Sequence, residues 1–536
     1  MAQNRQVFLI LVLTIAVCEA ASSQSARFFA DDPIQATPPP LPVRKPVRQD
    51  ITHSLDFLSK STKWTTPRRK PAGAVNTLGE VPDSEWFTMR HAKRRMTRDE
   101  LKRGPGSSEA PVPPFKVIGG KNQGIMPGFR IKDSKNRAYF VKVDPFGYPE
   151  LASAADVVVS RFLYAIGYNT PDNEIVDLTL SDLRLSEKAT INPPDEQPRK
   201  MTWNDVERMV VRVPHYSDGS FRVMASLAIE GENIGPFQYE GTRPDDPNDI
   251  IPHEDRRDLR GLNVIFAWLN NTDAKASNTF DTVVNEKGTR FVRHYLMDFG
   301  SALGSDGDAP KDPRLGYEFV LPTPIPALTQ ILSLGLSPAP WERVRYPKLR
   351  GVGNFESQSF DPGKWKPNYP NPAFMSCLAD DDYWAAKQVM AFTDDDIRAI
   401  VETARFTDPE ATEYMVRTLA ERRDKIGRAY FSNILPLDHF HVENQQLLFD
   451  DLSVQYGFQS AETYQVSWSE FDNIHQKHTP VQNSGSAHLP QAVLEAVSGS
   501  YFSTVIVAHN DPLKTVTVYL RKEGSSYKIV GIDRTW

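Results

Sequence analysis

The chain has 536 residues, of which 40% are hydrophobic and 24% charged, and its formal net charge is -6. This length exceeds one ordinary domain and suits two or three. The slightly acidic balance gives no electrostatic reason to expect nucleic acid or an anionic membrane as a partner.

The first twenty residues are typical of a signal peptide. A polar start with Arg5 leads into an apolar run from Val7 to Val17 that is too short to cross a bilayer, and Ala20 fits a cleavage site. Lipid attachment at Cys18 is the alternative, which the bulky residue before it disfavours. No later stretch is long and apolar enough to span a membrane. We therefore expect an exported protein, periplasmic or extracellular, without integral membrane contact.

Residues 21–74 are rich in proline and predict a disordered spacer, because such a segment buries too little surface to offset its ordering entropy. An N-terminal arm and a β-rich lobe follow over residues 75–235. Short apolar runs predict a meander of antiparallel strands over residues 115–118, 128–132 and 138–143, and further strands over residues 209–213 and 221–228. A helix is predicted from Pro149 to Ile166, ended by Gly167.

Residues 236–436 have mainly helical character. Helices are predicted over residues 256–270, 382–391, 394–404 and 409–431, and a hairpin over residues 279–297 that turns at Asn285–Gly288. From residue 442 to residue 536 the pattern alternates again and predicts a small antiparallel β-domain of the sandwich type. The fold class predicted from this order is α+β.

Three motifs carry candidate chemistry. Lys142 lies in the middle of an apolar strand, the run from Asp273 to Asn278 directly follows a helix, and Asp298 ends a strand in the sequence Asp-Phe-Gly. Phosphoryl transfer requires a cation for the phosphates, oxygen ligands for magnesium and a carboxylate beside the attacking hydroxyl. Lys142 would serve the phosphates, Asn278 and Asp298 the metal, and Asp273 the acceptor. Lys275 would contact the transferred group.

In this order the motifs resemble those of the protein-kinase-like superfamily, most nearly its atypical branches: the HipA-like, lipid-kinase-like and secretory-pathway kinases. The resemblance runs from about Phe115 to Phe431. It implies a two-lobed fold, with a β-rich N-lobe and a helical C-lobe, that binds ATP and Mg²⁺ in the cleft between them. It also implies an acidic helix residue that pairs with Lys142. Asp156 has that position, although the family usually has Glu, and Glu150 is the alternative.

The phosphate loop departs from the family pattern. Gly119-Gly120-Lys121-Asn122-Gln123-Gly124 lies between the first two predicted strands, where a glycine-rich loop belongs, but it is not Gly-x-Gly-x-x-Gly. Gly120, Lys121 and Gly124 would contact phosphates if it is such a loop. A plain flexible hairpin loop would have the same sequence.

Two functions from different classes fit these motifs. The first is an exported ATP/Mg-dependent phosphotransferase with a protein or small-molecule acceptor, or a related enzyme that transfers another part of the nucleotide. The second is a catalytically inactive, pseudokinase-like scaffold whose cleft or β-domain binds a partner or a glycan. The sequence has a bacterial character, and a bacterial envelope holds little ATP, which favours the scaffold. Retention of Asp273, Asn278 and Asp298 favours the enzyme.

Overall fold

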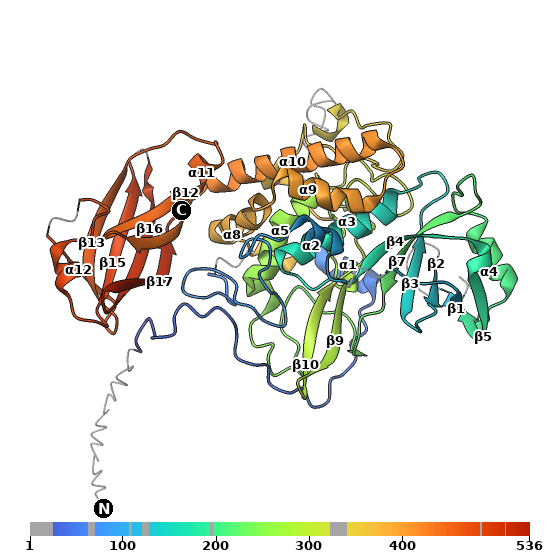
Figure 1. Ribbon diagram of the computed structural model, residues 1–536, viewed down its shortest axis with the longest axis horizontal. Coiled ribbons are helices and arrows are strands. Elements are labelled where there is room, and N and C mark those ends of the chain that lie inside the picture. The colour runs from blue at the N-terminus through green and yellow to red at the C-terminus, as the bar shows by residue number, and fades with distance from the viewer. Residues whose placement is uncertain are drawn as a thin grey trace, which may run out of the picture.

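The computed structural model describes residues 25–62, 70–106, 110–120, 128–192, 197–321, 340–482, 485–509 and 511–536 (Figure 1). In this part of the chain the predicted α+β architecture is confirmed: a β-rich N-lobe, a helical C-lobe and a separate β-domain follow one another. Figure 1 shows the N-lobe and the β-domain at opposite ends of the molecule, with the C-lobe between them. The predicted signal peptide lies outside the described residues.

The N-lobe is built on a seven-stranded sheet in the order β4-β7-β3-β2-β1-β5-β6. All neighbouring strands pair antiparallel except β1 and β5, which are parallel. Alternation along each strand buries one face in a core that includes Val117, Phe129 and Val141, while the other face carries Lys142. The strands are β1 (Phe115–Gly120), β2 (Gly128–Lys132), β3 (Ala138–Val143), β4 (Asn173–Leu178), β5 (Leu183–Ile191), β6 (Arg199–Lys200) and β7 (Phe221–Leu227).

One strand prediction in this lobe is wrong. Residues 209–213 belong to the end of helix α4 (Trp203–Val210) and the turn that follows it. Thr202 and Asp205 form a capping box at the start of this helix, and Val206 and Val210, one turn apart, are both buried against the sheet. A short apolar run does not by itself distinguish a strand from a helix. Here the capping box at Thr202 and Asp205 favours the helix.

Helix α3 (Leu151–Ile166) packs on the other face of the sheet and is buried along almost its whole length. Its first turn is capped by Asp144, which directly follows β3 and accepts hydrogen bonds from the backbone N–H groups of Glu150 (3.0 Å) and Ser153 (2.8 Å). The predicted end at Gly167 is confirmed. Asp144 therefore connects the end of strand β3 to the start of helix α3, in addition to the apolar packing of that helix.

The C-lobe packs its helices around one large apolar core. The predicted hairpin is confirmed as β9 and β10, which pair antiparallel and, with β8, form a three-stranded sheet. Among the helices that the structure describes, none has both the length and the apolar character needed to cross a bilayer. The elements are β8 (Glu232–Asn233), α5 (Arg257–Leu269), β9 (Thr279–Glu286), β10 (Thr289–Leu296), α7 (Pro372–Met375), α8 (Ala379–Met390), α9 (Asp394–Val401) and α10 (Pro409–Phe431).

The C-terminal β-domain differs in detail from a sandwich of two large sheets. It has one five-stranded antiparallel sheet in the order β14-β13-β15-β16-β17, and one face of it is covered by the hairpin β11–β12 and the short helix α12. The elements are β11 (Leu437–Glu443), β12 (Gln446–Asp451), α11 (Leu452–Gln455), β13 (Tyr464–Asp472), β14 (Lys477–Pro480), α12 (Gln491–Glu495), β15 (Tyr501–Ala508), β16 (Asp511–Glu523) and β17 (Ser526–Arg534).

The segment expected to be a spacer lies against the folded parts of the protein instead. Phe28 is buried on the free face of the β-domain sheet, and Val43 packs with Val283 and Val292 of the β9–β10 hairpin. Helix α1 (His53–Thr62) follows and contacts the one-turn helix η3 (Ala276–Asn278). The arm continues through α2 (Arg98–Arg103) to the N-lobe. Scattered apolar residues thus give this segment contacts that its composition did not predict.

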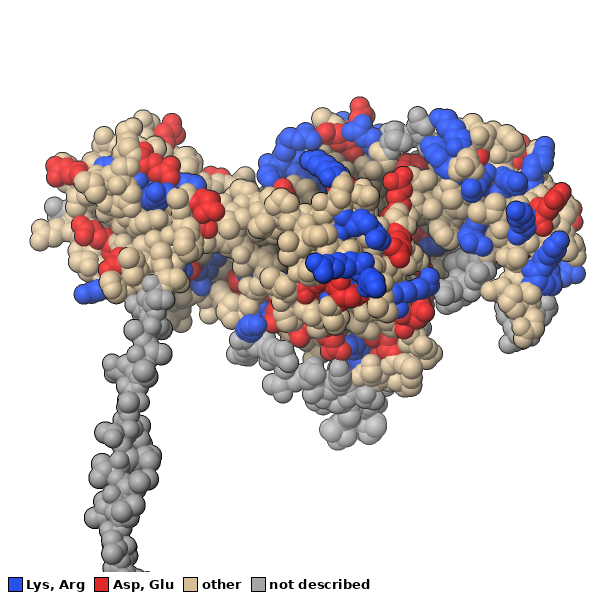
Figure 2. All heavy atoms as spheres, turned by 90° about the horizontal axis from the view of Figure 1, so that it is seen from below, with Lys and Arg blue, Asp and Glu red and all other residues tan. Residues whose placement is uncertain are grey.

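Charge is unevenly distributed over the surface. On the face seen in Figure 2, Lys and Arg gather over the N-lobe, whereas both signs are mixed over the C-lobe. Three basic residues, Lys116, Lys132 and Arg184, are direct neighbours across strands β2, β1 and β5. The net negative charge of the chain therefore does not describe its N-lobe.

Candidate active site

Lys142 joins one carboxylate from each lobe. Its ammonium group donates hydrogen bonds to Oδ2 of Asp156 on α3 (3.0 Å) and to Oδ1 of Asp298, which lies just beyond β10 (2.7 Å). Burial acts to lower the pKa of Lys142, but the attraction of the two carboxylates outweighs it and raises the pKa above its ordinary value. Lys142 is therefore a cation throughout the physiological pH range.

Asp156 connects Lys142 to the Asp-Phe-Gly segment. Its side chain is buried, and its second oxygen accepts a hydrogen bond from the backbone N–H of Phe299 (2.7 Å). Burial raises the pKa of the Asp156 carboxyl, while Lys142 and the Phe299 amide oppose the shift. Glu150, the alternative partner, instead accepts the backbone N–H of Thr407. The structure thus pairs Lys142 with Asp156.

The loop after α5 brings the other three predicted residues together. Asn270 ends the helix in a left-handed conformation (φ 49°), which turns the chain away from the helix axis. Oδ2 of Asp273 then receives the ammonium of Lys275 (2.7 Å) and the side-chain amide of Asn278 (3.0 Å). The same amide of Asn278 also donates to the backbone oxygen of Asp273 (3.0 Å), which closes the loop.

Asn278 precedes β9 and Asp298 follows β10, so both lie at the open end of the hairpin. The backbone N–H of Met297 donates to the backbone oxygen of Asn278 (3.0 Å). The side-chain amide nitrogen of Asn278 is used by Asp273, so its oxygen is the atom left for a cation, and Asp298 offers a half-exposed carboxylate. One carboxylate and one amide oxygen fit Mg²⁺, which completes its coordination with substrate phosphates and water.

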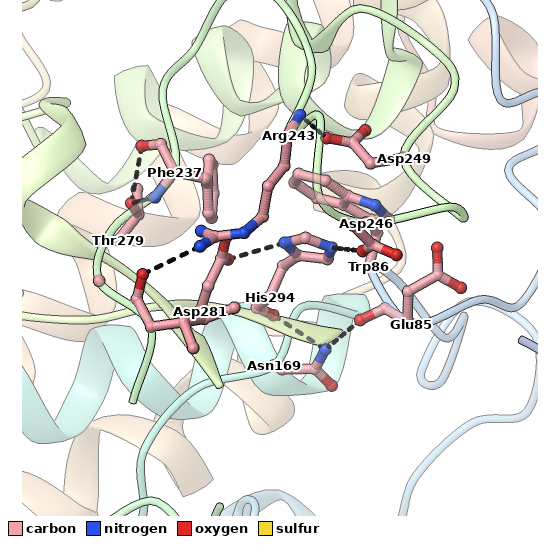
Figure 3. A network of polar contacts seen from close by, with 12 residues as sticks. Glu85, Trp86, Asn169, Phe237, Arg243, Asp246, Asp249, Thr279, Asp281 and His294 are labelled. Atoms are coloured by element: carbon pink, nitrogen blue, oxygen red, sulfur yellow. Dashed lines mark hydrogen bonds and ion pairs between the residues drawn. The ribbon is translucent and has the colours of Figure 1, made fainter. Parts of the chain in front are cut away.

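A buried polar network also contacts the β9–β10 hairpin (Figure 3). Asp281 on β9 and His294 on β10 are direct cross-strand partners, and Nδ1 of His294 lies 2.7 Å from Oδ1 of Asp281. Arg243 donates to the other oxygen of Asp281 (3.0 Å), and the His294 ring stacks on Trp86 of the arm (3.5 Å between centroids). The strands that end at Asn278 and Asp298 are thereby anchored by charge as well as by backbone pairing.

The glycine loop is only partly visible. Lys121 and Gly124 lie outside the described residues, and Gly120 is the last residue of β1. A Cβ atom at Gly120 would lie 2.8 Å from Cγ1 of Ile191, so packing against β5 already accounts for a glycine there. The phosphate-binding role of Gly120, Lys121 and Gly124 remains a prediction.

Two features of the site were not predicted. Lys311 is buried beside the loop that runs from Asp273 to Asn278, within a segment rich in proline and glycine that gave no local signal. Helix α1 lies against η3, and its Asp56 accepts a hydrogen bond from the hydroxyl of Tyr369 (2.9 Å). Burial and the nearby carboxylates of Asp56 and Asp273 raise the pKa of Tyr369 above its ordinary value. A single carboxylate in a spacer-like sequence could not have revealed this contact.

A cavity of about 130 Å³ lies in the C-lobe, at the end of α5. Asn270, three residues before Asp273, forms part of its wall, and Trp365 donates to the side-chain oxygen of Asn270 (3.1 Å). The remaining wall combines aromatic and charged side chains, among them Tyr317, Tyr346 and Glu356. The cavity therefore adjoins Asn270, the residue at which α5 ends and the loop of Asp273 begins.

Comparison with known proteins gives structural likeness alone. The chain matches no known protein family and no curated protein sequence. Among solved structures it is similar to the proinflammatory kinase CtkA of Helicobacter pylori, with a TM-score of 0.32 and 13% identity over 58% of this chain and 93% of that one. It is also similar to the Golgi casein kinase solved with Mn and ADP, with a TM-score of 0.30 and 10% identity over 62% and 75% of the two chains. The case for a nucleotide site rests on the side-chain geometry.

Proposed function

We propose that this chain is an exported phosphotransferase that uses Mg²⁺ and moves the γ-phosphoryl group of ATP to a hydroxyl of a protein or small molecule. The observation that carries the proposal is the meeting of Lys142, Asp156 and Asp298 in one ion-pair chain, with Asp273 and Asn278 in the loop bonded to the same hairpin. A cation, two metal-binding oxygens and a carboxylate beside them are the parts that phosphoryl transfer requires.

Each charged residue has a separate task in this proposal. Lys142 neutralises phosphate charge, and Asp156 keeps its ammonium in place. A divalent cation held by Asp298 and Asn278 would offset the charge that the phosphates carry. In this proposal Lys142, Asp298 and Asn278 bind and orient the nucleotide and its metal, and Asp156 orients Lys142. None of these side chains needs to exchange a proton.

Asp273 acts on the acceptor. Its carboxylate accepts the proton of the acceptor hydroxyl as that oxygen bonds to the γ-phosphorus, and the bond from the γ-phosphorus to the β–γ bridging oxygen breaks, so ADP leaves. Lys275, 2.7 Å from the Asp273 carboxylate, places a positive charge next to the group in transit. Asn278 fixes the orientation of Asp273 through its two hydrogen bonds.

Nucleotide binding by the purified protein tests the proposal. The intact mass first shows whether residues 1–20 have been removed. ATP is then titrated with and without Mg²⁺ by thermal shift and calorimetry, with Asp298→Asn as the test variant. Asn tolerates the left-handed backbone at this position (φ 61°), whereas Ala would add strain. We expect Mg²⁺-dependent binding that weakens at least about tenfold in Asp298→Asn, because a metal ligand has lost its charge.

Asp31→Asn, which alters an exposed carboxylate of the N-terminal segment, is the matched control and should bind as the parent does. If neither ATP nor another nucleotide stabilises the parent chain, the phosphotransferase proposal is wrong. A kinase-shaped scaffold would then be the better interpretation.

A further inference from the structure

A buried lysine connects the two loops that carry the catalytic and metal-binding residues. Lys311 is 1% exposed, and its ammonium donates to Oγ1 of Thr272 (2.8 Å) and to the backbone oxygen of Ser301 (2.6 Å). Thr272 is fully buried and directly precedes Asp273, while Ser301 lies three residues after Asp298. One ammonium group therefore contacts both loops at once.

The backbone of Lys311 is fixed as firmly as its side chain. Its N–H donates to the backbone oxygen of Gly304 (2.8 Å), and its own backbone oxygen accepts the side-chain amide of Asn354 (2.7 Å). A long side chain normally loses much conformational freedom when it is ordered in this way. With both ends held, Lys311 has a defined length and direction between Thr272 and Ser301.

The surroundings of this ammonium are unusual for a structural lysine. Both of its hydrogen-bond acceptors are uncharged, and among the described residues it forms no salt bridge within 4 Å. The carboxylates that act on it electrostatically are Asp306 and Asp273. Burial lowers the pKa of Lys311 to about 8, and these two carboxylates oppose the shift. Burying a charge beside neutral partners is costly and calls for a reason.

We propose that Lys311 is a positioning residue that holds the Asp273 loop and the Asp298 segment in register and keeps a positive charge behind Asp273. This inference rests on the proposed phosphotransferase function and adds a residue to its machinery. Lys311 acts through Thr272 and Ser301 and does not touch the reacting atoms. We call this contact of Lys311 with Thr272 and Ser301 the clamp. Because a displacement of a reacting group by about 1 Å can cost about 100-fold in rate, loss of the clamp should affect turnover more than nucleotide binding.

Three variants test the clamp. Lys311→Met keeps most of the side-chain volume and removes the charge, Lys311→Arg keeps the charge, and Lys364→Met removes a surface lysine paired with Asp361 as the matched control. We expect Lys311→Met to lose about 100-fold in kcat with little change in KM for ATP. Lys364→Met should match the parent. A Lys311→Met variant with the parent's kcat would overturn the proposal.

The pH profile separates a charge requirement from simple packing. The folded-state pKa of Lys311 lies below that of the unfolded chain, so the ammonium is present below about pH 8 and is lost above it. Turnover by the parent should therefore fall as the pH rises through about 8, and this fall should be absent in Lys311→Arg, which stays charged. The same alkaline limb in both proteins would contradict the role of Lys311.

Hydrogen–deuterium exchange provides a readout that does not depend on turnover. In Lys311→Met we expect faster exchange in both residues 271–278 and residues 298–304, and no change in Lys364→Met. Faster exchange confined to the neighbours of residue 311 would overturn the proposed role of Lys311.

If the parent hydrolyses or transfers no phosphate, the proposed function fails, but the exchange comparison still tests whether Lys311 holds the two loops together. If Lys311→Met does not fold, the isosteric Thr272→Val, which removes one acceptor, takes its place with the same expected exchange pattern.

Discussion

At the scale of single residues, Asp156 is one of the side chains that join the two lobes. It accepts hydrogen bonds from Lys142 in the N-lobe and from the backbone of Phe299 in the C-lobe. An aspartate is one methylene shorter than the usual glutamate, so the segment that follows Asp298 must approach closely. Gly300 permits this approach, because a Cβ atom there would lie 3.3 Å from Oδ2 of Asp156.

Replacement of that glycine should therefore separate the lobes slightly. We expect Gly300→Ala to destabilise the protein by about 1–2 kcal/mol through overpacking, and to weaken binding of Mg·ATP because Asp156 and Lys142 shift. Urea denaturation and calorimetry measure the two effects. Gly147→Ala is the control, since a Cβ atom at Gly147 meets nothing within 4 Å. Equal stability of the two variants would argue against a tight contact at Asp156.

Residues with a local sequence signal could be predicted, and residues without one could not. Lys142, Asp273 and Asp298 each sit at a defined place on a predicted element, so their order in the chain indicated a shared site. The choice between Asp156 and Glu150 depended on which way α3 turns, which the cap at Asp144 decides. Lys311 lies in a segment without periodicity, where only the folded chain shows what a side chain reaches.

At the scale of elements, the β9–β10 hairpin is the part of the site that the sequence predicted best. Lys287 and Gly288 both have positive φ angles (51° and 85°), as a two-residue turn between antiparallel strands requires. The alternating strands then bring Asn278 and Asp298 together at its open end. The buried pairing of Asp281 with Arg243 and His294 was not predicted: Arg243 lies outside the hairpin, and the alternating pattern does not show that this pair of cross-strand neighbours is buried.

Loss of that pairing should loosen the hairpin. We expect Asp281→Ala to lower the free energy of unfolding by about 3 kcal/mol, since Arg243 and His294 remain buried without their carboxylate. Glu286→Ala removes an exposed carboxylate of the same hairpin, paired with Arg293, and should cost less than about 1 kcal/mol. Chemical denaturation followed by tryptophan fluorescence distinguishes them. Similar losses in both variants would mean that the buried network adds nothing beyond a surface ion pair.

At the scale of the whole molecule, the N-terminal segment ties distant parts together. Phe28 is buried against Phe471 and Tyr519 of the β-domain, Val43 packs on the β9–β10 hairpin, and α1 contacts η3. Composition predicted a spacer here because the apolar residues are few and widely separated. Phe28 and Val43 are nevertheless buried against residues of other domains, and such long-range contacts leave no pattern in the local sequence.

The contact of Phe28 should stabilise the β-domain from outside it. A Cβ atom at Gly531 would lie 2.4 Å from the Phe28 ring, so strand β17 leaves space for that ring. We expect Phe28→Ala to cost about 3 kcal/mol and to speed hydrogen exchange in β16 and β17. Phe29, whose side chain is 57% exposed, provides the control Phe29→Ala. Unchanged hydrogen exchange in Phe28→Ala would show that the segment contacts the sheet without stabilising it.

The path of this segment also has a consequence for biosynthesis. Arg27 donates to the hydroxyl of Tyr519, a partner 492 positions later in the chain. At about 5–20 residues per second, the ribosome completes that partner roughly half a minute or more after residue 27 has emerged. During this interval the segment has no β-domain to bind, so its docking belongs to the last steps of maturation. The part of the segment around Arg27 and Phe28 can therefore reach its final position only after translation of the β-domain.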